Sequence, residues 1–405
     1  YSASKLVDNW KKKYTLTAEG RDLDFISLSA VILWDRLAPD IPNLEKIEEM
    51  VQKGYDLLDE IKPKAACDRW LKAWDYLKEL LPAEIKNINN VNEVIGGIDY
   101  VYKWTLDLAC YLNNAGLKHE KYHKKRIDYI LDVLNRFPNS EDDYTSTMRN
   151  DLAETYFLIG EEEKGEKLFK NIIERYPEFL WGYLSWGDQY ADVDREVFNY
   201  KKAKSIYEMA LKQIDFHRDD IKSRIKALER KREGLKTKQK IISWYRSSLS
   251  EDGLSEKTVQ TRINHIDPFL KYIIFYLRNI YFELIIDNLK SDDILDFLGT
   301  WIIQQELATS DSEINEFCQH LKSFITFVFS DNIIPRELLT EFRQICDSEG
   351  YFIMLLRKYQ DIYKSSPNLK KLFPKLQEWE EYNCYSKWYG WYKLNQGEEE
   401  EEPEK

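Results

Sequence analysis

The chain has 405 residues, which exceeds the usual size of one compact core and predicts two or three domains or an elongated helical array. Its 43% hydrophobic and 32% charged residues are typical of a soluble, folded chain, so we expect disorder only at the ends. A net charge of −12 argues against sequence-independent binding to nucleic-acid phosphates, because that binding needs a positive face.

The cysteines and the apolar runs indicate the compartment. No C-x-x-C pair occurs, so neither a disulfide framework nor a cysteine zinc site is predicted. The most apolar run, Tyr272–Ile286, is interrupted by Arg278, Asn279 and Glu283, and it predicts a buried helix instead of a membrane span of about 18 residues. We therefore expect a cytoplasmic protein in a reducing compartment, without membrane contact. The five cysteines are Cys67, Cys110, Cys318, Cys346 and Cys384.

Apolar residues recur at spacings of three and four along almost the whole chain, whereas sustained alternation is hard to find. The few glycines and prolines mostly fall between amphipathic segments of ordinary helix length. The pattern predicts an all-α chain of antiparallel helical hairpins.

The first part of the chain contains "LWDRLAPDIPNLEKIEEMVQKGYDLLDE" and "ACDRWLKAWDYLKELL", which predict helical hairpins. Their residue pattern resembles that of the helical region of bacterial proteins that carry a C-terminal SEC-C zinc motif. That cysteine-rich motif is absent from this sequence, so the resemblance implies a fold and no metal.

The letters "HEKYH", His119 to His123, match the H-E-x-x-H pattern of zinc hydrolases, in which two histidines one helical turn apart hold the metal. The sequence continues as "KKRIDY", without the third histidine of a metzincin, although Glu154 could serve as a downstream carboxylate ligand. Five cationic residues surround the motif and oppose a dication. We interpret the match as an accident of a surface helix and expect no metal and no cofactor.

A repeat of about thirty residues occurs twice in the middle of the chain. Small and aromatic residues stand at fixed offsets where two helices interlock, and Gly165 is the small residue that lets two helices approach. The pattern resembles the tetratricopeptide (TPR) family. It departs from that family in residue type at Gly165 and Ile172, where alanine is commoner, and at Asp215, which replaces the second proline. The matching positions are Leu152, Ala153, Tyr156, Gly160, Gly165, Phe169, Ile172 and Pro177 within Ser146–Pro177, then Tyr183, Trp186, Gly187, Tyr190, Ala203, Tyr207 and Ala210.

The TPR resemblance implies a concave surface on which an extended peptide lies, formed by the first helices of successive repeats. The acidic residues on this surface, Glu154 and Asp188, favour a basic or amide-rich ligand. The alternative is that two repeats serve as a spacer, with this face covered by the flanking hairpins. Carried over position by position, the ligand-facing residues are Asn150, Glu154, Phe157, Trp181, Leu184 and Asp188.

A basic segment, "RIKALERKREGLKTKQK", leads to a predicted boundary near Leu235. Beyond it, Gly253, Leu254, Ser255 and Thr258 open a module that resembles the helical core-binding domain of tyrosine recombinases. Further shared positions are Phe269, Leu270, Asp293, Ile294, Phe297, Leu298, Leu321, Phe324 and Val328.

The recombinase resemblance implies DNA contact, and Lys257, Arg262 and Lys271 are the candidate phosphate contacts. The alternative is a protein-interaction domain of the same shape, because the last helix of the module carries Glu313 and Glu316 where the family is rich in arginine. About 75 residues follow the module in this sequence, and they contain no Arg, His-x-x-Arg and Tyr constellation, so we expect no strand exchange.

The sequence thus predicts four segments: a solenoid of helical hairpins with a TPR-like array over 1–234, a small helical bundle over 235–334, a helical extension over 335–396 and a disordered acidic tail over 397–405. The cluster Trp388, Tyr389, Trp391 and Tyr392 predicts the apolar face of a terminal helix.

The predicted function is a non-enzymatic scaffold or adaptor that binds a protein or peptide partner. The second hypothesis is a DNA-associated accessory protein of a mobile element, and the third is a zinc hydrolase at His119.

Overall fold

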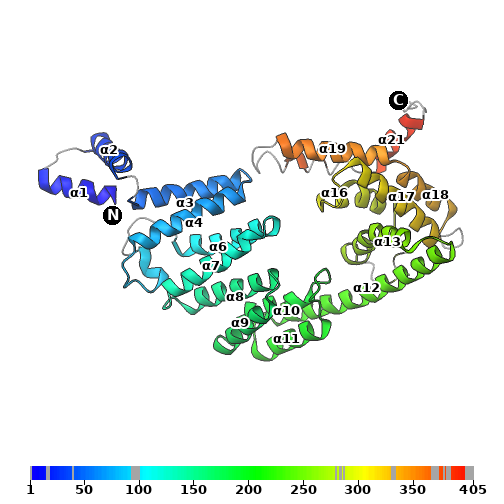
Figure 1. Cartoon of the computed structure of the whole chain (residues 1–405), viewed down its shortest axis with the longest axis horizontal. Helices are drawn as coiled ribbons and strands as arrows, with labels where there is room; N and C mark the ends of the chain where they lie inside the picture. Colours follow the sequence, from blue (N-terminus) through cyan, green and yellow to red (C-terminus); the bar gives the residue numbers. More distant parts are fainter. Residues whose placement is uncertain are drawn as a thin grey trace. The chain divides into compact units, whose positions relative to one another are not determined.

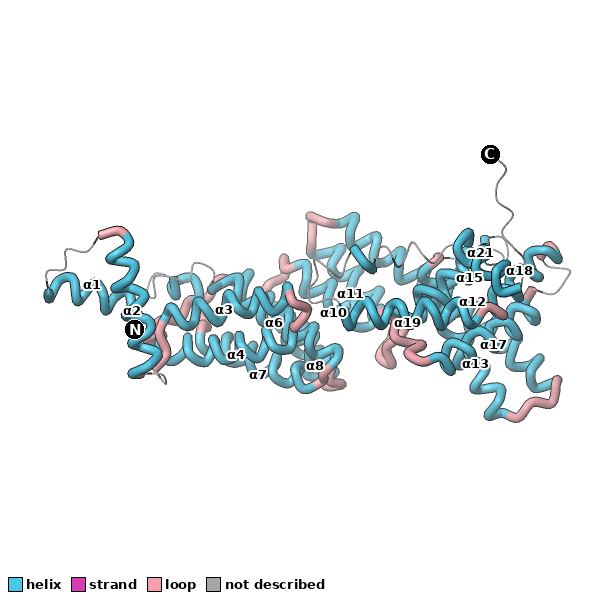
Figure 2. The backbone as a smooth tube through the Cα atoms, turned by 90° about the horizontal axis from the view of Figure 1, so that it is seen from above, coloured by secondary structure: helices cyan, strands magenta, loops and turns pink. Residues whose placement is uncertain are grey.

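The computed structural model describes residues 2–14, 19–38, 41–92, 101–278, 281, 285, 288–329, 334–365, 374–376, 379 and 385–396. These residues form helices and the loops between them, and none of them lies in a strand (Figures 1 and 2). The prediction of an all-α fold is therefore confirmed. The chain divides by its contacts into unit 1, Tyr1–Lys222, and unit 2, Ser223–Lys405.

Unit 1 is a succession of helical hairpins, because short connections force neighbouring helices to run antiparallel and to pack together (Figure 1). The hairpins are α3/α4, α6/α7, α8/α9 and α10/α11, and the helices α1 and α2, which cross each other in Figure 2, precede them. The helices are α1 (Ala3–Tyr14), α2 (Arg21–Leu37), α3 (Leu44–Asp59), α4 (Pro63–Leu80), η1 (Ile88–Asn90), α6 (Val101–Lys118), α7 (Lys121–Arg136), α8 (Asp142–Leu158), α9 (Glu162–Arg175), α10 (Leu180–Ala191) and α11 (Tyr200–Gln213).

Local sequence signals set several helix starts in unit 1. The Asn43 side chain accepts a hydrogen bond from the Lys46 backbone N–H at 2.8 Å and begins α3. Asn199 begins α11 in the same way. Pro63 occupies the first turn of α4, where its missing N–H would have had no helical partner.

Two glycines allow the helices within α8/α9 and within α10/α11 to pack closely. A Cβ at Gly165 of α9 would lie 2.5 Å from Cδ2 of Phe157 in α8. A Cβ at Gly187 of α10 would lie 2.3 Å from Cε1 of Tyr207 in α11. The interpretation of Gly165 as a close-packing residue is confirmed.

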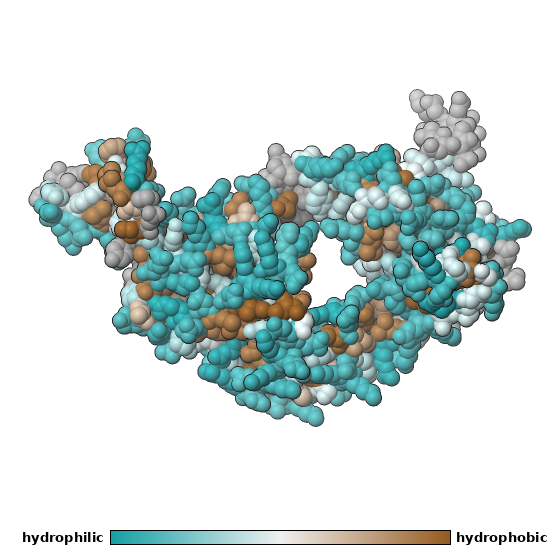
Figure 3. All heavy atoms as spheres, in the orientation of Figure 1, coloured by the Kyte–Doolittle hydropathy of each residue, from teal (hydrophilic) through white to brown (hydrophobic). Residues whose placement is uncertain are grey.

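Helix α2 differs from the helices of the hairpins, because it exposes much of its apolar surface (Figure 3). Phe25, Leu28 and Leu37 are 71%, 59% and 80% exposed, and Ala30 is the buried residue of this helix. In the described part of the chain, no helix is both long enough and apolar enough to cross a membrane.

The contact division falls within α12 (Arg218–Glu251), a single helix of 34 residues. The predicted boundary near Leu235 lies inside this helix instead of at its end. Between Arg224 and Lys240 the only turn-forming residue is Gly234, which costs a helix about 1 kcal/mol. A Cβ at Gly234 would meet Cγ2 of Ile274 at 2.7 Å, so the glycine is used here for packing.

Unit 2 is a helical bundle around one apolar core that extends from Ile241 to Trp388. The predicted extension after residue 334 shares this core. Trp388 of α21 is 1% exposed and Trp391 packs on Tyr351, which confirms the prediction that α21 has an apolar face. The predicted tail over 397–405 lies outside the described residues. The elements after α12 are α13 (Glu256–Lys271), η2 (Tyr272–Tyr276), α15 (Ser291–Asp296), η3 (Phe297–Trp301), α16 (Ile302–Gln304), α17 (Asp311–Val328), α18 (Arg336–Cys346), α19 (Glu349–Ser365) and α21 (Tyr385–Gln396).

Candidate partner-binding site

The predicted ligand-facing residues lie on α8 and α10, the first helices of two successive hairpins. The structure brings Asn150 of α8 against Ser185 of α10: the Asn150 amide donates to Ser185 Oγ at 3.1 Å. The same amide donates to Oε1 of Glu154 at 3.1 Å. Asn150 is only 6% exposed, so it joins the two helices from within.

Carboxylates line the same side of the first helices. Burial raises the pKa of Glu154, and the nearby charge of Asp151 raises it further, whereas hydrogen bonds from Ser185 and Asn150 lower it. Burial also raises the pKa of Cys110 on α6; the charges of Asp151, Asp107 and Glu154 raise it further, whereas the charge of Arg126 lowers it. The exposed thiol of Cys110 is thus influenced by carboxylates of α6 and α8 and by the Arg126 cation of α7.

Asp188 extends this arrangement to α10. Because α8 and α10 both begin their hairpins, they run in the same direction, and both Asn150 and Glu154 contact Ser185, about one helical turn before Asp188. Asp188 accepts a hydrogen bond from the Tyr207 hydroxyl, which fixes its position. We call the set Asp107, Asp151, Glu154 and Asp188 the acidic face.

The other predicted residues differ in their exposure. Phe157 and Leu184 are 3% and 2% exposed and belong to the packing between hairpins. Trp181, in contrast, is 56% exposed in the first turn of α10. Asn150 and Glu154 are thus joined by a hydrogen bond, Asp188 lies further along α10, and Phe157 and Leu184 are buried.

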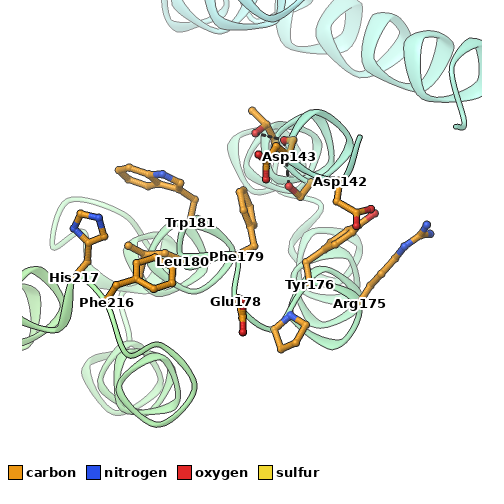
Figure 4. A pocket seen from close by; sticks show the side chains of 13 residues that line it. Asp142, Asp143, Arg175, Tyr176, Glu178, Phe179, Leu180, Trp181, Phe216 and His217 are labelled. Carbon is orange, nitrogen blue, oxygen red and sulfur yellow. Dashed lines mark hydrogen bonds between the residues drawn. The ribbon is translucent and has the colours of Figure 1, made fainter. Parts of the chain in front are cut away.

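A pocket of about 710 Å³ adjoins Trp181. We call it the Trp181 pocket. It lies between the first turn of α8, the loop from α9 to α10 and the loop that carries Phe216 and His217. Figure 4 shows Trp181, Phe216 and His217 at one end, Arg175 and Tyr176 at the other, and Asp142 and Asp143 along the side formed by α8.

The sequence did not indicate Ser185, Asp107, Asp151 or Phe216 as functional residues. Ser185 and Asp107 lack a distinctive spacing, and their roles depend on which helices stack together. Phe216 carries a weak signal, because a large aromatic side chain stands beside polar residues in the predicted loop "DFHRDD".

The "HEKYH" residues are separated by the start of a helix. His119 precedes α7, which begins at Lys121, while His123 lies inside it. His123 is 5% exposed and packs on Gly116, where a Cβ would lie 2.3 Å from its ring. Burial and the charge of Arg126 lower the pKa of His123. Within the described ranges, no group of three His, Cys, Asp or Glu side chains is arranged to hold a metal ion.

The three candidate DNA contacts occupy α13 in unit 2. Lys257 is exposed, Arg262 donates to Ser323 Oγ at 3.2 Å, and Lys271 lies 3.4 Å from Asp267. A helix turns by about 100° per residue, so Arg262 and Lys271, nine positions apart, point to opposite faces. The structure does not bring these three residues together on one surface.

The fold defines an all-α protein of packed helical hairpins. No family model and no curated protein matches the sequence. Among solved structures, a tetratricopeptide repeat protein from Parabacteroides merdae is similar to this chain, with a TM-score of 0.31 and 12% identity. The match covers 75% of this chain and 99% of that protein.

Proposed function

We propose that unit 1 is a non-enzymatic protein-binding scaffold that holds a basic segment of a partner on the acidic face. The observation that carries this proposal is that the first helices α6, α8 and α10 each carry a carboxylate held by a hydrogen bond, Asp107 by Tyr55, Glu154 by Asn150 and Asp188 by Tyr207, with the charge of Asp151 acting on Glu154. Carboxylates gathered on one side of a stack attract a cationic partner and fix its register more than they add raw affinity.

The Arg126 guanidinium offsets the negative charge of one carboxylate of the acidic face and leaves the charge of the others. It forms an ion pair with Asp151, with Nη2 and Oδ2 3.0 Å apart, and its side chain is 3% exposed. Arg126 is therefore hidden beneath the face. Among the described residues, Asp107 and Glu154 have no ion pair, and they remain available for a cation of the partner.

Affinity capture from the native cell extract tests the proposal, with nuclease added and bound proteins identified by mass spectrometry. We expect a basic partner that survives nuclease and whose recovery falls about 10-fold with the double variant Asp107→Asn, Glu154→Gln, since loss of two charge contacts of this kind costs more than 1 kcal/mol. The Asn150→Ala variant should weaken the same partner, because it removes the amide that positions Glu154.

The matched control is Glu174→Gln, which neutralises an exposed carboxylate on α9, a second helix of a hairpin. Its recovery of the partner should equal that of the unmodified chain. Equal recovery by the Asp107, Glu154 double variant, or loss of all partners with nuclease, would overturn the proposal.

A further inference from the structure

The Trp181 pocket lies apart from the acidic face, at the edge of the stack where first helices begin. The first turn of α8 supplies Asp142 and Asp143, and the first turn of α10 supplies Trp181. Phe216 closes the pocket from the loop after α11. Three hairpin connections thus meet around one cavity of about 710 Å³.

Trp181 is the exception in its helix. Ten of the twelve residues of α10 are buried, from Leu180 to Ala191, yet the Trp181 side chain is 56% exposed. Phe216, on another connection of the same pocket, is 51% exposed. Two large aromatic side chains exposed in one cavity are typical of a binding site, because each costs free energy while it remains in water.

The loop that carries Phe216 is held in place. The Arg218 guanidinium donates to the backbone carbonyls of Leu211 and Ile214, at 2.5 Å and 3.3 Å. His217 adopts a left-handed backbone conformation, with φ of 54°, and its Nδ1 lies 2.9 Å from Asp220 Oδ2. These contacts present Phe216 to the pocket before any ligand arrives, which limits the entropy lost on binding.

The charges around the pocket select the kind of ligand. Asp142, Asp143 and Glu178 are exposed, and in the described structure none of their carboxylates forms an ion pair. The cation at the far end, Arg175, lies over the Tyr176 ring at 5.3 Å. The aromatic end therefore borders carboxylates, and a cation over an aromatic ring gains about 0.5–2 kcal/mol.

We propose that the Trp181 pocket binds a lysine or arginine side chain of a protein partner, with an adjacent apolar residue of that partner against the half-buried ring of Phe179. The Trp181 and Phe216 rings contact the aliphatic stem and the cation, and Asp143 neutralises the charge. This inference rests on the proposed function, and it adds an anchor residue to the basic segment that the acidic face holds.

A random dodecapeptide library displayed on phage and panned on the full chain tests the proposal. We expect the selected peptides to share a lysine or arginine next to an apolar residue. In a synthetic copy of one such peptide, replacement of that cation by norleucine should weaken binding about 10-fold.

Substitutions of residues that line the pocket show whether the selected peptide binds there. Trp181→Ala, Phe216→Ala and Asp143→Asn should each weaken the selected peptide about 5- to 10-fold. The matched controls are Phe25→Ala on α2 and Asp128→Asn on α7, which remove an exposed phenyl ring and an exposed carboxylate elsewhere in unit 1. Both controls should bind as the unmodified chain does, and all variants should keep its helical circular dichroism.

Three outcomes would overturn the inference: no peptide is selected, the selected peptides lack a basic residue, or they bind equally well to Trp181→Ala and Phe216→Ala. Peptides that require Glu154 but neither Trp181 nor Phe216 would separate the two proposals. The acidic face would then stand as the binding surface, and the Trp181 pocket would not.

Discussion

Arg126 and Asp151 form a buried ion pair between two neighbouring hairpins, with 3.0 Å between Nη2 and Oδ2. Arg126 comes from α7 and Asp151 from α8. The side chains are 3% and 19% exposed, and Nη1 of Arg126 also donates to Thr155 Oγ1 at 2.8 Å. Burial raises the pKa of Asp151, whereas the charge and hydrogen bond of Arg126 lower it.

Arg126→Met should destabilise unit 1 by about 3–5 kcal/mol near neutral pH, because it leaves the Asp151 carboxylate buried without its cation. The measurement is urea denaturation followed by circular dichroism, with hydrogen exchange to assign the affected unit. Lys124→Met, at an exposed position of the same helix, is the control and should change the free energy of unfolding by less than about 0.5 kcal/mol.

The loss of unfolding free energy caused by Arg126→Met should also depend on pH. A carboxyl whose pKa is higher in the folded than in the unfolded state binds more protons when folded, so stability falls as pH rises between the two values. Without Arg126 the folded pKa of Asp151 rises further, and the deficit should be larger at about pH 8 than at about pH 5. A deficit that does not change with pH would show that lost packing, and not the unpaired charge, is the cause.

Gly187→Ala should destabilise unit 1 by about 1–3 kcal/mol, because the new Cβ would lie 2.3 Å from Cε1 of Tyr207, a ring that is 1% exposed. Helix propensity alone predicts that Gly187→Ala stabilises unit 1, since alanine stabilises a helix interior by about 1 kcal/mol relative to glycine. Thermal unfolding followed by circular dichroism distinguishes the two, and a higher midpoint for the variant would contradict the packing seen between α10 and α11.

His320→Gln should make unit 2 less sensitive to acid. Burial, together with the nearby side chains of His265 and Arg262, lowers the pKa of His320 to about 4, whereas Glu316 raises it. The folded state therefore binds fewer protons than the unfolded state, so stability declines as pH falls from about 6.5 to about 4. Removal of the imidazole removes this contribution.

The measurement for His320→Gln is hydrogen exchange of unit 2 peptides at several pH values in that window. The control is His119→Gln, at an exposed position of unit 1. If the variant loses protection on acidification as steeply as the unmodified chain, the His320 ring is not the group responsible.

The helical hairpins could be predicted because their signals are local. Ala153, Gly165 and Phe169 stand at offsets that the helix period itself requires, and all three are buried between the helices of one hairpin. Gly187 and Tyr207 behave likewise in the next hairpin. In each case the partners are close enough in sequence that one helix turn and one short loop determine the contact.

The candidate site could be predicted only in part, because it depends on how hairpins stack. The TPR resemblance predicted six ligand-facing residues, but position in the repeat could not show that Phe157 and Leu184 are buried while Trp181 is exposed. The contact of Asn150 with Ser185 and the approach of Phe216 to the Trp181 pocket join segments some 35 residues apart. Neither spacing carries a sequence pattern.

The Arg126–Asp151 pair has a consequence for how unit 1 unfolds. In a stack of repeats, a hairpin held only by apolar contacts can fray without its neighbours. Here the cation of α7 has its counter-charge in the next hairpin, and Lys202 of α11 pairs with Glu166 of α9 at 2.8 Å, again across a hairpin boundary. If one hairpin unfolded alone, a charged side chain of the next hairpin would lose its counter-charge. We therefore expect α6 to α11 to unfold as a single cooperative block.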